Sequence, residues 1–158
     1  MKKTTLTTLI IIGTMAAAVA QNVNIPDANF KAYLVGNTAI NTNADTEIQV
    51  SEASAFTGTI GCKNKAISSL TGIEAFTSLT ELDCSSNTLT TIDLSSNTVL
   101  SVLHCSSNSG LTSIDISKNT VLQKLTCSYT TSLTSLDVSK NTALKELTCA
   151  RSAITSID

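Results

Sequence analysis

The chain has 158 residues, enough for one domain, of which 42% are hydrophobic and 14% are charged. Its formal net charge is −2 and its basic residues are scattered along the chain, which argues against a nucleic-acid partner. Thr, Ser and Asn recur at regular spacings between aliphatic residues, which indicates a repeat rather than a disordered tract.

Residues 1–20 have the features of a secretory signal peptide. A basic start precedes an apolar stretch over residues 6–12, and Ala18-Val19-Ala20 has the small-residue pattern of a signal-peptidase site. The apolar stretch is too short to span a bilayer and no second one follows, so we expect no transmembrane segment. We predict a protein that is secreted or displayed on the bacterial cell surface; the alternative is a buried N-terminal helix.

Residues 21–56 precede the repeats and are predicted to form a helical N-terminal cap. We expect one helix over residues 27–35 and a second over residues 51–56. Four apolar residues fit one face of the first helix and its approach: Ile25, Phe30, Tyr33 and Leu34. Because the end of a repeat stack exposes aliphatic side chains to water, this face is expected to cover that end.

The segment between the two expected helices carries the one motif with specific chemistry. Residues 41–52 match the twelve-residue EF-hand calcium loop at positions 1, 3, 5, 8 and 12. The oxygen ligands would be Asn41, Asn43, Asp45, the Glu47 carbonyl and Glu52. However, Asn41 replaces the usual Asp, and Thr46 stands where Gly makes the sharp turn. Two interpretations stay open: weak calcium binding, or a loop held by its own Asx hydrogen bonds.

Residues 57–158 repeat with a period of 21 or 22 residues. Four blocks share the pattern LxxLxC and begin at Leu79, Leu100, Leu122 and Leu144. A degenerate earlier copy ends in Cys62, so all five cysteines occupy one repeat position, at separations of 22, 21, 22 and 22 residues. Each block has a second half of similar pattern, as at Leu89. The alternation predicts two short strands per turn and two parallel sheets around a shared aliphatic core.

Cysteine and asparagine mark the inward positions of the repeat. Buried free thiols that fill a ladder fit the cysteines best, because their number is odd and no CxxC pair is present to chelate a metal. A disulfide between neighbouring turns remains an alternative. Asparagine recurs at the ninth position of the half-repeats, at Asn87, Asn97, Asn108, Asn119 and Asn141. These amides are predicted to bond the backbone where strands give way to loops.

The repeat has a known counterpart. The pattern LxxLxCxxNxLxxLDLxxNxx from Leu79 to Val99 resembles the IRREKO class of bacterial leucine-rich repeats, and the stretch from Leu70 to Phe76 resembles internalin-type repeats. The resemblance covers most of residues 57–158. It implies a leucine-rich-repeat solenoid, mainly parallel β on two faces with little helix. It also implies a surface or secreted protein used in adhesion and protein recognition, without naming a ligand.

The two faces of the predicted coil differ in how much they vary. In the second half of each repeat, the outward strand positions carry Thr, Ser and Asp again and again. In the first half of each repeat, the outward strand positions vary: Glu81, Asp83, Val102, His104, Lys124, Thr126, Glu146 and Thr148. Variation among faithful repeats is what a recognition surface shows, although drift on a solvated sheet gives the same pattern. Glu81, Asp83 and His104 lie on adjacent turns without a nucleophile and its base, so we expect no catalysis.

Two functions from different classes fit these features. The first is an exported protein-binding or adhesion module that uses the variable face. The second is a structural spacer or display scaffold for a further domain, because the chain stops halfway through a half-repeat and is expected to be truncated. Only 3% of the residues are aromatic, so stacking platforms for sugars are scarce and a protein ligand is favoured. We expect no cofactor other than calcium at residues 41–52.

Overall fold

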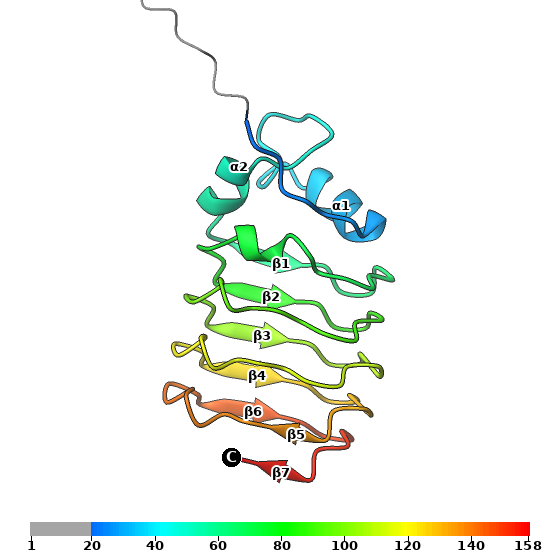
Figure 1. Cartoon of the computed structure of the whole chain (residues 1–158), viewed down its shortest axis with the longest axis vertical. Coiled ribbons are helices and arrows are strands. Elements are labelled where there is room, and N and C mark those ends of the chain that lie inside the picture. The colour runs from blue at the N-terminus through cyan, green and yellow to red at the C-terminus, as the bar shows by residue number, and fades with distance from the viewer. Residues whose placement is uncertain (1–19) are drawn as a thin grey trace, which may run out of the picture.

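The computed structural model describes residues 20–158, and the predicted signal peptide lies outside the described residues except for its last position. The chain coils into a solenoid whose turns stack along the long axis of the molecule (Figure 1). Two short helices lie at one end of the stack and the last strand lies at the other. Within residues 20–158, no helix has the length and hydropathy needed to cross a membrane.

The helices of the cap form where the sequence predicts them. The first helix, α1 (Ala28–Val35), begins after Asp27, whose carboxylate accepts hydrogen bonds from two backbone amides of the first turn. The same carboxylate accepts hydrogen bonds from the backbone amides of Ser68 and Ser69 in the first repeat. Burial raises the pKa of Asp27, but these hydrogen bonds outweigh burial and lower it. The helix start is thus tied to the solenoid.

Apolar side chains join the cap to the first turn of the solenoid. Phe30 and Leu34 of α1 are fully buried, as their spacing predicts. The second helix, α2 (Val50–Ala55), is followed by Phe56, whose ring packs edge-on against Phe76 with 6.3 Å between centroids. This aromatic pair lies beside the 3-10 helix η1 (Ile73–Ala75), so the cap covers the first aliphatic layer.

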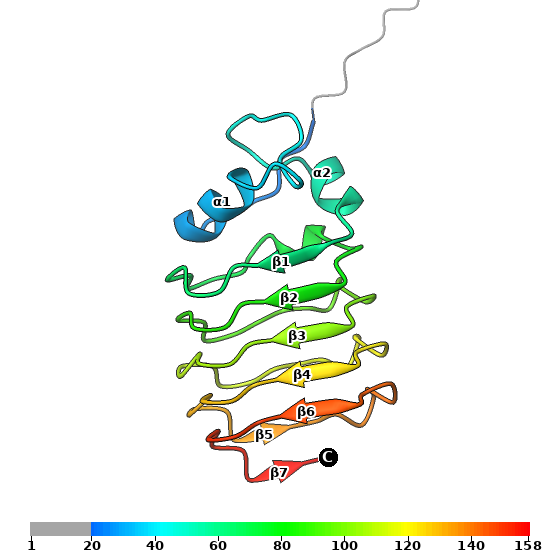
Figure 2. The same ribbon diagram turned by 180° about the vertical axis from the view of Figure 1, so that it is seen from behind.

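Five strands form one parallel sheet along one side of the solenoid. They are β1 (Thr59–Gly61), β2 (Glu81–Asp83), β3 (Val102–His104), β4 (Lys124–Thr126) and β6 (Glu146–Thr148), in that order. Figures 1 and 2 show this sheet from its two faces. The strands pair in register, so their central residues Ile60, Leu82, Leu103, Leu125 and Leu147 form one inward column. The flanking residues of each strand face outwards, as the two-residue alternation predicts.

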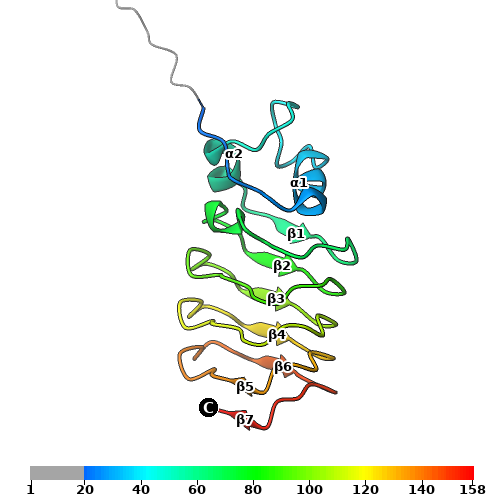
Figure 3. The same ribbon diagram turned by 45° about the vertical axis from the view of Figure 1, so that its right-hand side comes forward.

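The second sheet, on the opposite side of the coil, is shorter. It consists of β5 (Ser135–Leu136) paired with β7 (Ser156–Ile157) (Figure 3). In the earlier turns, Asp93 and Asp115 form a single bridge. Asp93 and Asp115 each accept a hydrogen bond at 2.9 Å from the backbone amide two residues further on. Asp83 in β2 and Asp137 after β5 accept the same kind of hydrogen bond, so this turn marks the end of the extended segment on both sides of the coil.

Buried asparagines join successive turns, and their predicted structural role is confirmed. On the second side, Asn119 donates hydrogen bonds to the carbonyls of Leu94 and Asn97 at 3.1 and 2.9 Å, and Asn141 makes the equivalent pair one turn later. On the first side, Asn87 donates to the carbonyls of two cysteines. All five ladder asparagines are at most 7% exposed. Their amides therefore satisfy backbone carbonyls that stacking removes from water.

The cysteines fill the inward column next to the central leucines. Cys62, Cys84, Cys105 and Cys127 are fully buried, while Cys149 in the last turn is half-buried. All five are free thiols. Burial raises the pKa of Cys62 to about 12 and that of Cys127 to about 11, and it also raises the pKa of Cys84 and Cys105. The predicted inward position is thus confirmed for four cysteines and holds in part for Cys149.

Candidate functional site

The outward residues of the five-stranded sheet form one continuous face, which we call the sheet face. The structure brings all eight predicted recognition residues together on it. One column holds Glu81, Val102, Lys124 and Glu146, and the next holds Asp83, His104, Thr126 and Thr148. The outward residues of β2, β3 and β4 are half-buried, whereas those of β6 are exposed.

Side chains of the sheet face contact their neighbours on adjacent strands. The Nδ1 atom of His104 lies 2.8 Å from the Thr126 hydroxyl. Lys124 pairs with Glu146 at 2.6 Å, and the hydrogen bond and charge of Lys124 lower the pKa of Glu146. Because both partners of this pair are largely exposed, it contributes little to folding. These contacts run along the stack, and each one joins two side chains of the same column on neighbouring strands.

The acidic residues beside His104 do not gather around its ring. Asp83 and His104 face each other in register, but the Asp83 carboxylate accepts a hydrogen bond from the Ser85 backbone amide at 3.0 Å. In the part of the chain that the structure describes, no three His, Cys, Asp or Glu side chains are grouped so as to hold a metal ion. His104 therefore bonds a neighbouring strand residue, Thr126, and is not the centre of an acidic cluster among the described residues.

Two residues that the sequence did not single out stand at the corner where the strands of the sheet face end. At this corner, one residue per turn has a left-handed backbone, with φ from 54° to 58°: Asn64, Ser86, Ser107, Tyr129 and Arg151. The Arg151 guanidinium lies 5.4 Å from the centre of the Tyr129 ring and donates a hydrogen bond to its hydroxyl at 3.1 Å. One signal in the sequence could have indicated this pair. At the position two residues after each cysteine, Tyr and Arg replace the Asn and Ser of the earlier turns.

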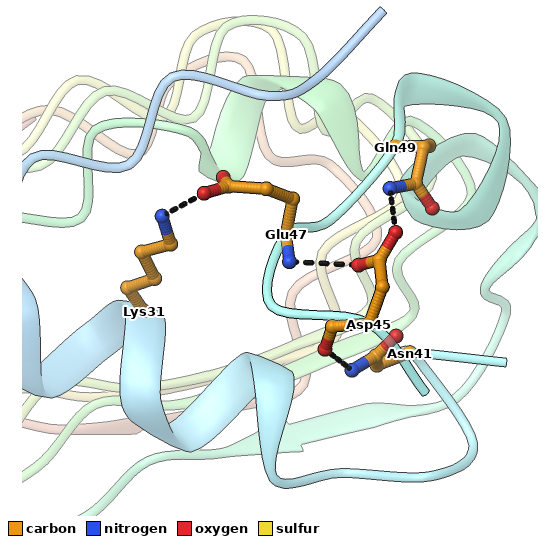
Figure 4. Close-up of polar contacts among 5 residues, drawn as sticks. All are labelled: Lys31, Asn41, Asp45, Glu47 and Gln49. Carbon is orange, nitrogen blue, oxygen red and sulfur yellow. Dashed lines mark hydrogen bonds and ion pairs between the residues drawn. The ribbon is translucent and has the colours of Figure 1, made fainter. Parts of the chain in front are cut away.

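The loop between α1 and α2 holds four of the five predicted calcium ligands, and the fifth, Glu52, lies in the first turn of α2. Asn43 accepts a hydrogen bond from the backbone amide of Asp45 at 3.0 Å, and Asp45 accepts one from that of Glu47 at 2.7 Å. Figure 4 shows the Asp45 carboxylate between Glu47 and Gln49, with Lys31 of α1 paired to Glu47 at 2.6 Å. The loop is therefore closed by its own hydrogen bonds.

Glu52, the twelfth residue of the predicted calcium motif and the third residue of α2, accepts hydrogen bonds from both the loop and the start of the helix. Its carboxylate accepts hydrogen bonds from the backbone amides of Thr42, Asn43 and Gln49 at 2.8, 3.2 and 3.0 Å. Burial raises the pKa of Glu52, but these hydrogen bonds outweigh burial and lower it. The carboxylate is thus ionised at neutral pH and lies next to the first residues of the loop.

Asn41, the first residue of the loop, is only 4% exposed. Its amide nitrogen donates to the carbonyls of Val35 and Asp45 at 3.0 and 2.8 Å, whereas its Oδ1 atom has no hydrogen-bond partner among the described residues. The sequence predicts the sharp turn at the sixth position of the loop, Thr46. In the structure the residue with a left-handed backbone is instead the fourth, Ala44 (φ 58°). Thr46 therefore does not make the turn that Gly makes in a calcium loop.

The repeat geometry has a match among known families. A family model described as the LRR domain of endo-beta-N-acetylglucosaminidase EndoS matches residues 41–141, more than half of the chain. The chain belongs to this leucine-rich-repeat family. The matched residues include most of the turns that carry the cysteine column and the sheet face. No match is found among curated proteins.

Two solved leucine-rich-repeat structures are similar to the chain. The functional domain of InlJ from Listeria monocytogenes, which includes a cysteine ladder, is 36% identical with a TM-score of 0.65, over 92% of this chain and 36% of that one. An internalin, InlF, from the same organism is 22% identical with a TM-score of 0.58, over 89% of this chain and 48% of that one, and shows the fold alone. The chain thus spans less than half of either relative. The predicted internalin-like leucine-rich-repeat solenoid is confirmed.

Proposed function

We propose that the chain is an exported protein-binding module whose sheet face recognises a protein partner. The observation that supports this is the placement of eight side chains of six residue types in two columns across one regular sheet. The inward Leu and Cys positions beneath this face hardly change from turn to turn. A rigid backbone with variable outward side chains is suited to specific recognition, because side chains can change there without altering the fold.

The charges of the sheet face indicate what such a partner must complement. Glu81 and Asp83 make β2 acidic, while the Lys124 ammonium adds a hydrogen-bond donor on β4. A partner that lies across the strands would therefore meet two carboxylates on β2 and an ammonium group on β4. Export rests on the composition of residues 1–20, and adhesion at a cell surface is the specific role that we propose.

The first test is selection of binding peptides on the purified chain. We expect random twelve-residue peptides displayed on phage to be enriched on it, and their synthetic forms to bind at least about tenfold more weakly to Thr126→Arg, in the middle of the sheet face. The control is Thr112→Arg, an exposed change on the second side, which should leave the dissociation constants unchanged. No enrichment, or equal losses for both variants, would contradict the proposal and favour the spacer role.

We also propose that residues 41–52 bind calcium and thereby stabilise the cap. The supporting observation is the buried Oδ1 atom of Asn41, which has no hydrogen-bond partner among residues 20–158. Asn97, Asn119 and Asn141 share this feature inside the stack, but Asn41 alone stands at the first ligand position of the predicted calcium motif. Leaving a buried acceptor unsatisfied costs on the order of 1–3 kcal/mol, which ligation of a cation would offset. Asn43, Asp45 and Glu52 belong to the same motif and supply further oxygen atoms of the kind that calcium prefers.

The calcium proposal is tested by calorimetry. Calcium at about 5 mM, above the weak limit of extracellular sites, should raise the melting temperature, because a ligand bound only by the folded state stabilises it. Glu52→Gln should abolish this rise, even though the variant starts from a lower melting temperature. Glu47→Gln is the matched control and should keep the rise, since only the Glu47 backbone carbonyl is a predicted ligand. If the unchanged chain shows no heat of binding and no thermal shift, the proposal is wrong and the loop is only a structural cap.

A further inference from the structure

The pair of Tyr129 and Arg151 is the one place where the left-handed corner carries large side chains. Tyr129 is 47% exposed, and Arg151, the only arginine in the sequence, is also exposed. Large side chains rarely adopt a left-handed backbone, and the earlier turns place Asn or Ser at this position. The two residues therefore occupy a conformation that smaller residues would adopt at lower cost.

The geometry of the pair holds the guanidinium in place. Arg151 lies against the Tyr129 ring at 5.4 Å and donates one of its five N–H groups to the Tyr129 hydroxyl at 3.1 Å. The Tyr129 backbone amide also donates to the carbonyl of Ala150 at 3.0 Å, which fixes the two turns relative to each other. The remaining donors of the planar guanidinium are thus oriented before any partner arrives.

Arg151 has no carboxylate partner within the chain as described. The ion pairs among residues 20–158 join Lys31 to Glu47 and Lys124 to Glu146, and neither involves Arg151. The corner is continuous with the sheet face, because Tyr129 and Arg151 each lie three residues after the last residue of β4 and β6. An oriented, uncompensated guanidinium therefore stands at the edge of the proposed recognition surface.

We propose that Tyr129 and Arg151 form an anchor for an acidic side chain of the protein partner. The carboxylate accepts two hydrogen bonds from the free edge of the Arg151 guanidinium, the geometry in which Arg and carboxylates pair most strongly. The exposed Tyr129 ring packs against the apolar part of the same segment, since Tyr and Arg are the residues that most often dominate protein interfaces. This inference rests on the sheet face being the binding surface and adds the chemistry that the partner must supply.

The test uses twelve-residue peptides selected from phage on the unchanged chain. We expect the enriched peptides to carry Asp or Glu, and one such peptide to bind Arg151→Gln at least about tenfold more weakly. Replacing the acidic residue of the peptide by its amide should cause a similar loss. The two changes together should be no worse than either alone, because they remove the same contact. Enriched peptides without an acidic residue, or equal binding to Arg151→Gln, would overturn the proposal.

Matched variants separate the anchor from general charge and from folding. Lys145→Gln removes one positive charge from the same end of the solenoid and should leave peptide affinity unchanged. Arg151→Lys keeps the positive charge but loses the planar pair of donors. Its affinity for the peptide should lie between that of the unchanged chain and that of Arg151→Gln. Tyr129→Asn should weaken binding while the melting temperature stays equal or rises, because Asn adopts the left-handed backbone more readily. A lower melting temperature with unchanged binding would show that the pair only supports the fold.

A spectroscopic readout follows from the sequence. Because Arg151 is the only arginine, its side-chain Nε–Hε group gives a single nuclear magnetic resonance signal of its kind. That signal should shift on addition of the acidic peptide and stay in place with the amide form. If Thr126→Arg abolishes binding while Arg151→Gln does not, the sheet face binds without the anchor and this inference alone fails. If neither variant changes binding, the proposed function fails as well.

Discussion

Each cysteine of the column follows an inward leucine or isoleucine by two residues, yet the five thiols lie in two different environments. Four are fully buried, and Cys149 is half-buried in the last turn. The pKa values of Cys62 and Cys127, about 12 and 11, lie above the ordinary 9.0 because burial disfavours the thiolate. Since the unfolded chain loses these protons first, the stability that the buried thiols contribute is present below pH 9 and is lost as the pH rises through 11 and 12.

We expect a thiol-reactive probe at pH 8 to label Cys149 quickly and the other four cysteines only after denaturant is added. Only the thiolate reacts, and the four buried thiols are both protonated and inaccessible. Mass spectrometry of peptides after timed labelling gives the rate for each site. Rapid labelling of all five in the native protein would contradict the inward column, and failure to label after unfolding would indicate disulfides.

At the scale of the element, the second-side asparagine ladder joins turns that have few strand contacts. Asn97, Asn119 and Asn141 each donate two hydrogen bonds to carbonyls of an earlier turn. Their Oδ1 atoms are buried and have no partner within residues 20–158. The amide nitrogen is therefore the part of each side chain that holds the turns together.

Removing that donor should destabilise the solenoid. Asn119→Ala removes the hydrogen bonds from the earlier turn's Leu94 and Asn97 carbonyls, which keep only their backbone donors, and leaves a cavity, so it should lower the free energy of unfolding by about 2–4 kcal/mol. Asn119→Asp should cost more at pH 7, because it places a carboxylate against those carbonyls. The Asp variant should recover as the pH falls, since burial raises its folded pKa and the protonated acid can donate one hydrogen bond.

Guanidinium denaturation at several pH values measures both effects. Thr120→Ala, at the exposed neighbouring position, is the control and should change the free energy of unfolding by less than about 0.5 kcal/mol. If Asn119→Ala is as mild as this control, the ladder does not hold the turns together.

For the whole molecule, the repeat period and the two-residue alternation together predict the solenoid and the sheet face. Both are local patterns, so eight outward residues such as Lys124 and Thr126 could be assigned to one surface from sequence alone. The helix α1 was also predictable, because Asp27 and the apolar spacing after it are local signals. The length of the second sheet was not, because it depends on hydrogen bonds between turns.

The pairing of Tyr129 with Arg151 and the backbone of the cap loop could not be predicted from the sequence, for a different reason. The left-handed backbone at Tyr129 and Arg151 is imposed by the corner that follows each strand, and no propensity of Tyr or Arg indicates it. Likewise, Thr46 suggested a strained turn, but the chain places the left-handed residue at Ala44 instead. Both features come from how the backbone closes loops, which composition does not reveal.

The strands lie across the long axis of the stack, and this orientation decides how the solenoid responds to force (Figure 1). A pull between the two ends loads the hydrogen bonds between turns along their own direction, and each turn contacts only its neighbours. The turns would therefore peel off one at a time. Each would release about 75 Å of extended chain from a layer about 4.8 Å thick. A partner bound across the sheet face would clamp those layers together, so the module would lengthen under load only after its partner let go.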